Sequence, residues 1–242
     1  MKRISILALA IALAACSQQN APSEALEKEA DSLVEAAQGS EPSPAALAGP
    51  FAPRNECSEL DGAEPFLAML RGAVTARDAQ AVANLAAEDV KLDFGGGAGR
   101  GELLSRLQTP DSPLWTALDQ LMQLGCASND QGGITLPWYF AQDDFPVDPM
   151  MGMIVTGENV PLRAEPEVAA REIMTLSWDA VEVVMEPESV EGWRHVRVPA
   201  TDTREETTGW MQDASLRSYI DYRIIASSRN KTWRITSLIA GD

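Results

Sequence analysis

The sequence has almost no histidine: His195 is the single one among 242 residues. Zinc hydrolases bind their metal through several histidine or cysteine side chains, and a catalytic histidine needs a nucleophile or carboxylate oriented toward it. His195 instead lies near Arg194 and Arg197 on a predicted strand with a mixed surface face. We therefore predict a structural role for His195, and a protein that is not an enzyme and uses no metal or cofactor.

Basic residues are also scarce. Lys and Arg total 19 against 36 Asp and Glu, which gives a formal net charge of −17. A field of this sign repels phosphate backbones and anionic lipid head groups. Nucleic acid is therefore excluded as an expected partner, and colloidal solubility is the plainest role for the charge.

The N-terminal apolar run is too short to cross a membrane. Residues 4–15 form a stretch of twelve residues, whereas a spanning helix needs about 20. The stretch follows Lys2 and Arg3 and ends in Leu13-Ala14-Ala15-Cys16, which resembles a lipobox, so residues 1–15 are predicted as a lipoprotein signal peptide. The resemblance implies a lipid on Cys16 and, because Ser17 follows it, an outer-membrane anchor facing the periplasm. An ordinary signal peptide cleaved near Ala15 is the alternative.

Residues 16–56 have the composition of a tether. They are rich in Ala, Ser, Pro, Glu and Gln and contain no aromatic residue before Phe51. Such a segment can bury little apolar surface, and its prolines keep the chain extended. We predict a flexible tether that holds a folded domain away from the membrane.

Two cysteines, Cys57 and Cys126, remain once Cys16 is assigned to the lipid. An even pair in an exported protein most simply forms one disulfide. Two free buried thiols are the alternative, and without a Cys-x-x-Cys motif a metal site has little support.

Residues 57–153 are predicted as an α+β domain. Apolar residues recur at helical spacing after Pro65, and Asp78 is placed to cap a second short helix. A strand with one buried face follows, and Ser112 with Pro113 begins a further helix that ends at Gly125. The residues that carry these patterns are Phe66, Leu70, Ala73 and Val74 for the first helix, Val90, Leu92 and Phe94 for the strand, and Leu114, Leu118 and Leu121 for the last helix.

Two loops of this domain could in principle bind ions. The glycine-rich residues 95–101 could cradle an anion with backbone N–H groups, helped by Arg100, but they match no phosphate-binding motif. The loop that carries Asp143, Asp144 and Asp148 lacks the register of a calcium loop. We predict a flexible turn and a solvated acidic loop.

Residues 154–217 contain short apolar runs separated by turn residues, which predicts a small antiparallel barrel. The order of these runs resembles the bacterial SH3-like (SH3b) domain, over about a quarter of the chain. The resemblance rests on Arg163, Pro166, Gly192-Trp193, Gly209-Trp210 and Leu216. It departs at residues 176–179, where a glycine is absent, and at Pro161, which predicts an edge strand or a bulge.

The last residues, 218–242, predict a β-hairpin with its turn at 228–231. Together with the helix, strand and glycine-rich loop of residues 73–101, this hairpin resembles the NTF2-like cone fold. If the hairpin completes the N-terminal domain, the SH3-like module is inserted between its pieces. The overall fold class expected is α+β.

The SH3-like resemblance implies a binding or scaffolding module whose ligand is peptidoglycan or a segment of an envelope protein. The candidate binding residues are the aromatics Trp178, Trp210 and Tyr219, expected to be exposed at the barrel rim, since aromatic faces bind sugars and peptides at low entropic cost. The alternative is that Trp193 and Trp210 fill the barrel core, and this is what we expect for Trp193. A small-molecule pocket in an NTF2-like domain and a purely structural envelope lipoprotein are the alternatives.

Overall fold

The computed structural model describes residues 47–185 and 190–241, and residues from Leu47 onward form one compact unit. The predicted signal peptide, Cys16 and most of the tether lie outside the described residues. Phe51 and Ala52, at the end of the predicted tether, are buried, so the folded unit begins before residue 57. No helix within the described ranges is long and apolar enough to span a bilayer.

Four α-helices occur in the described residues: α2 (Ala63–Thr75), α3 (Ala79–Asn84), α4 (Arg100–Gln108) and α5 (Pro113–Leu121). The predicted apolar stripe of α2 is buried. Asp78 caps α3 as predicted, because its Oδ1 accepts the backbone N–H of Ala81 at 2.9 Å. Pro113 occupies the first turn of α5, where a missing N–H costs nothing.

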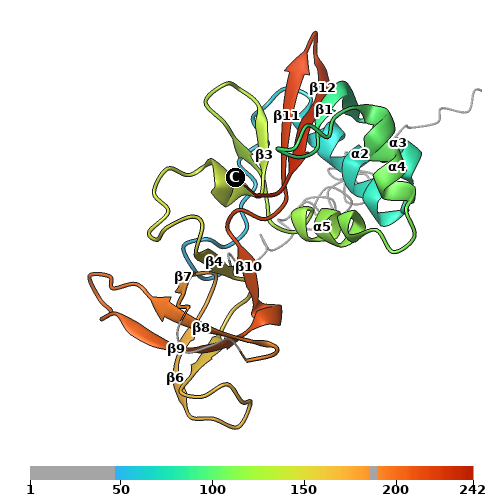
Figure 1. Cartoon of the computed structure of the whole chain (residues 1–242). Coiled ribbons are helices and arrows are strands. Elements are labelled where there is room, and N and C mark those ends of the chain that lie inside the picture. The colour runs from blue at the N-terminus through green and yellow to red at the C-terminus, as the bar shows by residue number, and fades with distance from the viewer. Residues whose placement is uncertain (1–46, 186–189, 242) are drawn as a thin grey trace, which may run out of the picture. The chain divides into compact units, whose positions relative to one another are not determined.

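The first sheet has five strands in the order β1-β12-β11-β3-β2. These are β1 (Ala86–Lys91), β12 (Thr232–Ile239), β11 (Arg223–Arg229), β3 (Ile134–Leu136) and β2 (Ala127–Ser128). β12 pairs in parallel with β1, while the other pairings are antiparallel. The C-terminal hairpin therefore lies in one sheet with the N-terminal elements (Figure 1).

The strand predicted through Phe94 is shorter than expected. β1 ends at Lys91, and Phe94 is 49% exposed. The chain turns because Asp93 Oδ1 accepts the backbone N–H groups of Gly95 (2.9 Å) and Gly97 (2.7 Å). A short carboxylate side chain that accepts hydrogen bonds from backbone N–H groups a few residues later favours a turn over a continuing strand.

Apolar side chains from α2 to α5 pack against the first sheet in a single buried cluster. Trp233 of β12 lies against Phe66 of α2 and donates its indole N–H to the Asp61 carbonyl at 2.9 Å. The predicted disulfide between Cys57 and Cys126 is confirmed, and both cysteines belong to this cluster.

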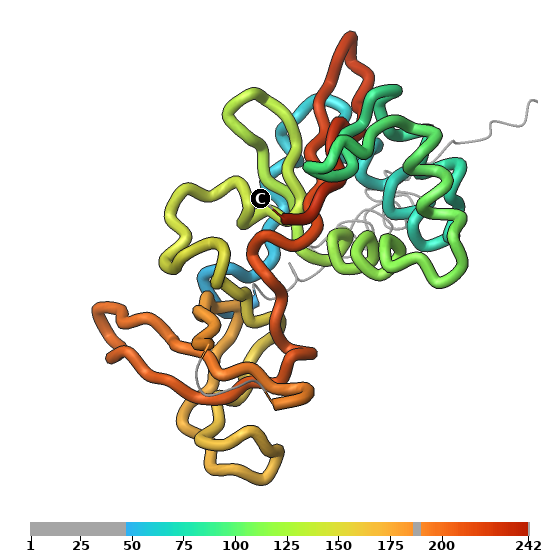
Figure 2. Tube along the Cα trace, viewed as in Figure 1, coloured from blue at the N-terminus to red at the C-terminus, as the bar shows by residue number. Residues whose placement is uncertain are grey.

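The second sheet has seven strands in the order β10-β4-β7-β8-β9-β5-β6, with all pairings antiparallel. Its strands are β4 (Gly152–Val155), β5 (Val160–Arg163), β6 (Glu172–Leu176), β7 (Ala180–Val183), β8 (Trp193–Val198), β9 (Thr207–Gln212) and β10 (Leu216–Ser218). Figure 2 follows the chain through this sheet and back into β11 and β12.

This sheet is curled, because one buried cluster contains residues from strands far apart in its order. Val155 of β4 and Leu176 of β6 both belong to the cluster, although five strand spacings would separate them by about 24 Å in a flat sheet at about 4.8 Å per spacing. The end strands β6 and β10 do not pair in the described residues. The predicted antiparallel module is therefore present, but the closed barrel is not.

Pro161 lies within β5, between β9 and β6, so the edge-strand alternative is wrong. The register shifts between Leu162 and Arg163, and β5 pairs with β9 at Arg163 alone. A bulge beside the proline, the other alternative, accommodates the missing N–H.

A third apolar cluster joins the two sheets. It contains Phe51, Leu124, Ala127, Trp138, Tyr139, Ile154, Ala180 and Tyr219. Trp138 and Tyr139 belong to the 3-10 helix η1 (Trp138–Ala141), just after β3, while Ile154 and Ala180 belong to β4 and β7.

Candidate functional site

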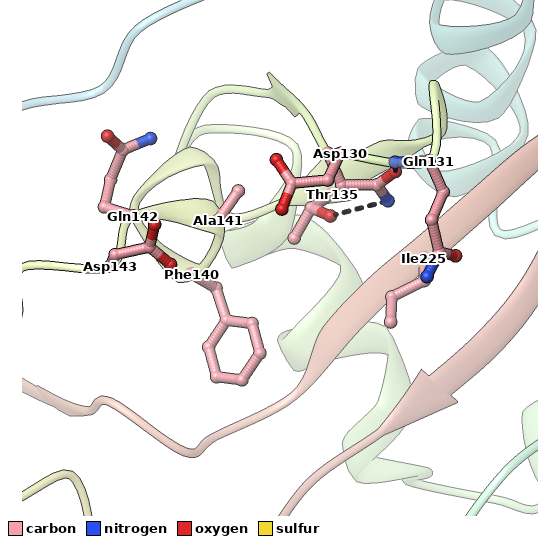
Figure 3. A pocket seen from close by; sticks show the side chains of 9 residues that line it. Asp130, Gln131, Thr135, Phe140, Ala141, Gln142, Asp143 and Ile225 are labelled. Atoms are coloured by element: carbon pink, nitrogen blue, oxygen red, sulfur yellow. Dashed lines mark hydrogen bonds between the residues drawn. The ribbon is translucent and has the colours of Figure 1, made fainter.

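Two cavities of similar volume are candidate binding sites. The first, about 310 Å³, lies by the β2–β3 turn and is lined by Asn129, Asp130, Gln131, Thr135, Phe140, Ala141, Gln142, Asp143 and Ile225 (Figure 3). Asn129 Oδ1 accepts the backbone N–H groups of Gln131 (3.2 Å) and Gly133 (2.8 Å), and its Nδ2 donates to Thr135 Oγ1 at 3.4 Å. These polar groups hold the turn together.

The carboxylates at this first cavity do not form a metal site. Figure 3 shows Asp130 and Asp143 on separate segments. In the described part of the chain, no three His, Cys, Asp or Glu side chains converge to hold a metal ion. Nearby, Asp148 Oδ1 accepts the backbone N–H of Met150 at 2.8 Å. None of the buried side-chain N or O atoms without a hydrogen-bond partner among the described residues belongs to a residue that lines the first cavity.

The second cavity, about 320 Å³, lies where α5 meets the second sheet. Gln120, Gln123 and Leu124 line it from α5 and the turn that follows. Its other lining residues are Thr156, Trp178, Ala214, Leu216 and Arg217, from segments that border β4, β6 and β10. The polar groups on this wall are two amides, a hydroxyl, an indole and a guanidinium.

Trp178, predicted as a binding residue, lines this second cavity. Its backbone has φ 43°, in the left-handed region that bulky side chains rarely adopt. This conformation is held on both sides, because its N–H donates to the Gly157 carbonyl (2.9 Å) and its own carbonyl accepts from Phe51 (2.8 Å). Strained backbone of this kind persists where the surroundings impose it, and it gathers at binding sites.

The indole nitrogen of Trp178 is buried without a hydrogen-bond partner among the described residues. A buried N–H that lacks an acceptor lowers stability. Arg217 Nε, an atom of another lining residue, also lacks a hydrogen bond among the described residues. Both nitrogens are shielded from solvent, so they are donors of the packed interior beside the cavity and do not open onto it.

Arg217 is buried, with 5% of its surface exposed. Its terminal nitrogens donate to Tyr139 Oη (2.8 Å) and to the Tyr222 carbonyl (2.6 Å). Asp221 Oδ2 lies 3.5 Å from Nε, an ion-pair contact that is not a hydrogen bond. The guanidinium is thus held mainly by neutral acceptors, with one partly exposed carboxylate beside it.

Burial raises the pKa of the Tyr139 hydroxyl to about 12, although the nearby Arg217 opposes that rise. Tyr139 therefore stays neutral at physiological pH. It accepts a hydrogen bond from Arg217 without neutralising its charge, and the carboxylate beside that guanidinium is Asp221.

None of the three predicted binding residues is exposed as expected. Trp178 is half-buried against the cluster that joins the sheets, and Trp210 and Tyr219 are each 8% exposed. Trp210 lies against the His195 ring at 5.0 Å between centroids, and Tyr219 stacks on Phe145 at 3.9 Å. Neither of these two lines the second cavity, and any part they play in binding stays a prediction. Trp193 is buried, but it does not belong to the apolar cluster inside the second sheet.

Sequence reasoning missed Arg217 and the two glutamines. Arg217 stands between Leu216 and Ser218 on a three-residue strand, where a basic residue gives no sign of burial. Gln120 and Gln123 lie at the end of α5, on positions that a helical pattern assigns to solvent. No motif in the sequence links these residues to Trp178.

The glycine-rich loop holds a carboxylate of its own. Asp93 accepts from the backbone of Gly95 and Gly97 and pairs with Arg106 Nη2 at 2.6 Å. The Arg106 guanidinium, followed by the Gly97 N–H, lowers the pKa of Asp93 below its usual value. Arg100 is occupied elsewhere, donating to the Ala86 carbonyl and pairing with Glu88. The loop is an organised turn around Asp93.

Comparisons with known proteins give little further. The sequence matches no protein-family model and no curated protein. A designed NTF2-like protein of solved structure is distantly similar, with 10% sequence identity and a TM-score of 0.28 over 75% of this chain and 97% of that chain. Likeness at this level carries no functional argument.

Proposed function

We propose that the protein is a non-enzymatic lipoprotein of the outer membrane, anchored through Cys16 and facing the periplasm, that binds peptidoglycan. The observation that carries this proposal is the second cavity, which is lined by the half-buried Trp178 together with the amide side chains of Gln120 and Gln123. An aromatic side chain and a few polar groups that converge in a concavity are typical of a binding site for sugars or peptides.

The lining of the cavity supports binding rather than catalysis. Its polar side chains are those of Gln120, Gln123, Thr156, Trp178 and Arg217. Nucleophilic or acid–base chemistry needs an activated nucleophile beside a base, and this lining supplies a hydroxyl without an imidazole or carboxylate next to it. Amides, an indole and a guanidinium are groups that recognise sugars and peptides.

The second sheet supports an SH3-like assignment for the binding module. Trp193 and Trp210, the tryptophans of the two Gly-Trp pairs, are both buried, and β8 and β9 pair directly so that His195 lies opposite Trp210. We propose an SH3-like module whose sheet is curled and open, and which contributes Trp178 to the ligand cavity.

Co-sedimentation of the full chain, kept in detergent micelles, with purified peptidoglycan sacculi tests this function. We expect the wild type to sediment and Trp178→Ala to lose at least about tenfold in affinity, since one anchoring aromatic often dominates binding. Val168→Ala is the matched control, because Val168 is exposed and does not line the cavity.

Thermal unfolding of both variants should accompany the assay, so that a loss of binding is not mistaken for a loss of folding. Absence of sedimentation by the wild type at every salt concentration would sink the peptidoglycan proposal. Capture of an envelope protein by wild type and not by Trp178→Ala would then identify a protein segment as the ligand.

A further inference from the structure

The C-terminal hairpin carries a charge opposite to that of the whole molecule. The chain has a formal charge of −17, but residues 222–241 contain four basic residues and no Asp or Glu. Arg229, Lys231 and Arg234 of this group lie at or beside the turn that joins β11 to β12. Because charges separated by more than a Debye length are largely screened, a small anion at this turn experiences mainly the local positive field.

A third cavity, of about 210 Å³, lies on the same hairpin. Side chains alternate between the two faces of a strand. Ala86, Ala226 and Ile235 of β1, β11 and β12 belong to the apolar cluster under the helices, so the residues next to them in sequence lie on the opposite face of the first sheet. The polar residues that line the cavity on that face are Asp89, Ser227, Arg229, Thr232, Arg234 and Thr236.

The two arginines of this cavity are accessible to a ligand. Arg229 is exposed and Arg234 is half-buried, and neither forms an ion pair with any of the described residues. Arg234 Nη1 donates to the Trp233 carbonyl at 2.9 Å, which leaves its other donors for a ligand. Strand pairing places Ser227 opposite Arg234 and Thr232 opposite Arg229, so each guanidinium has a hydroxyl beside it. Guanidinium groups and hydroxyls together bind oxyanions.

Asp89 decides which oxyanion this cavity accepts. An ionised carboxylate only accepts hydrogen bonds, so it repels an anion that has no proton to donate. Sulfate and phosphodiesters carry no proton at neutral pH, whereas inorganic phosphate keeps at least one. The neighbouring Glu88 is paired with Arg100 at 2.7 Å, and Asp89 is the carboxylate that lines the cavity.

We propose that the third cavity binds inorganic phosphate. Arg229 and Arg234 are its cationic donors. Ser227 and Thr232 add hydroxyl donors, and Asp89 accepts a hydrogen bond from the phosphate O–H. The volume equals that of about seven water molecules of the liquid, which gives a small tetrahedral anion room for part of its hydration shell. None of these five residues lines the second cavity, so the inference does not depend on peptidoglycan binding.

Titration calorimetry with sodium phosphate as the probe tests the site. The full chain is kept in maltoside micelles, in a buffer that contains neither phosphate nor sulfate. We expect phosphate to bind at least about tenfold more tightly than sulfate at equal ionic strength, and Arg234→Gln to weaken phosphate binding about tenfold through the loss of a charge-assisted donor. Added sodium chloride should also weaken binding, because both arginines are reached by solvent.

Arg71→Gln is the matched control. Arg71 is exposed and does not line this cavity, and its replacement changes the net charge by the same amount. We expect this variant to bind phosphate as the wild type does. Circular dichroism should verify the fold of each variant, and the exposed Arg229 offers Arg229→Gln as a second test if Arg234→Gln does not fold. Absence of phosphate binding by the wild type, or an equal loss in Arg71→Gln, would overturn the inference.

Asp89→Asn tests the selectivity for a protonated anion. The amide donates as well as accepts and carries no charge, so sulfate should bind to this variant within about threefold of phosphate. A wild type that binds sulfate as tightly as phosphate, or a variant that keeps the wild-type preference, would overturn the role of Asp89 and with it the assignment of phosphate.

A phosphomonoester distinguishes free phosphate from a phosphorylated partner. Its second proton is lost at about pH 6, so at about pH 8 it has no proton for Asp89, whereas inorganic phosphate still has one. We expect inorganic phosphate to bind more tightly than phenyl phosphate at that pH. Equal or tighter binding of phenyl phosphate would overturn the assignment of the free ion in favour of a phosphorylated ligand.

Discussion

The two sheets of this protein are stabilised by different means. The first is covered by α2 to α5, packs them in one large apolar cluster and is tied by the Cys57–Cys126 disulfide. The second has no α-helix among its own described elements and buries a smaller cluster of mostly aliphatic side chains inside its curl.

The second sheet, whose apolar cluster is the smaller one, also contains ion pairs. Asp179 pairs with Arg204 at 2.5 Å, and Glu182 pairs with Arg197 across β7 and β8. The first region carries ion pairs as well, such as Asp93–Arg106, so ion pairs alone do not distinguish the two regions. The comparison teaches that the first region has the larger apolar cluster and the disulfide, whereas Asp179–Arg204 of the second is the more buried of these two pairs. The second cavity lies where the two regions meet.

Removal of the disulfide should have the largest effect on stability, and it should destabilise the first region. The double variant Cys57→Ala, Cys126→Ala opens a loop of sequence separation 69 and should lower the free energy of unfolding by about 4 kcal/mol. Guanidinium denaturation of the oxidised wild type, the reduced wild type and the variant measures this. A loss below about 1 kcal/mol would mean that the cross-link adds little to the apolar cluster.

Truncation of a core side chain in the second sheet should have the next largest effect on stability. Leu162→Ala removes a fully buried side chain of β5 and should cost about 3 kcal/mol. Hydrogen exchange should show lost protection in β5, β8 and β9 with protection retained in β11 and β12. Equal loss in both sheets would show that they unfold as one cooperative unit, which would break the comparison.

The Asp179–Arg204 pair should contribute less than the core. Both side chains are mostly buried, with 16% and 18% exposed, so Arg204→Met should cost about 2 kcal/mol, between the values of exposed and fully buried pairs. Arg194→Met is the control, because the Arg194–Asp213 pair is exposed and should contribute at most about 0.5 kcal/mol. Similar costs for the two variants would contradict a special role for the buried pair.

The smallest expected effect on stability at neutral pH concerns Tyr139, which belongs to the apolar cluster that joins the two sheets. Its folded-state pKa is raised to about 12, above the ordinary value near 10, so the stabilisation it gives is complete below pH 10 and is lost as pH rises toward 12. Tyrosinate absorbance should show a late-titrating tyrosine that disappears in Tyr139→Phe. An unchanged titration in that variant would contradict the assignment.

Local patterns in the sequence predicted much of the first region. The Asp78 cap, the stripe of α2 and the start of α5 at Pro113 each depend on a few neighbouring residues. The disulfide was predictable because, once Cys16 is assigned to the lipid, Cys57 and Cys126 are the two cysteines that remain. These features need no knowledge of how distant segments meet.

The cavity could not be predicted, because its lining comes from four separate parts of the chain. Trp210 was misjudged for a different reason. Side chains alternate along β9, so Trp210 lies on the outer face of the sheet while its neighbour Met211 points into the core. The His195 ring covers Trp210 on that outer face, and Gly209, Trp210 and Met211 are therefore all buried. The second sheet would close into a barrel only if its end strands β6 and β10 paired, and the sequence of one strand does not show which strand it pairs with.

The parallel pairing of β12 with β1 also sets an order of assembly. β1 ends at Lys91, but its partner is not complete until Ile239, whereas every strand of the second sheet lies between Gly152 and Ser218. As the chain is synthesised, the second sheet can finish folding while the first still lacks β12, the strand that joins β1 to β11. A nascent chain that stops short of residue 232 would therefore carry a complete second sheet beside an incomplete first sheet.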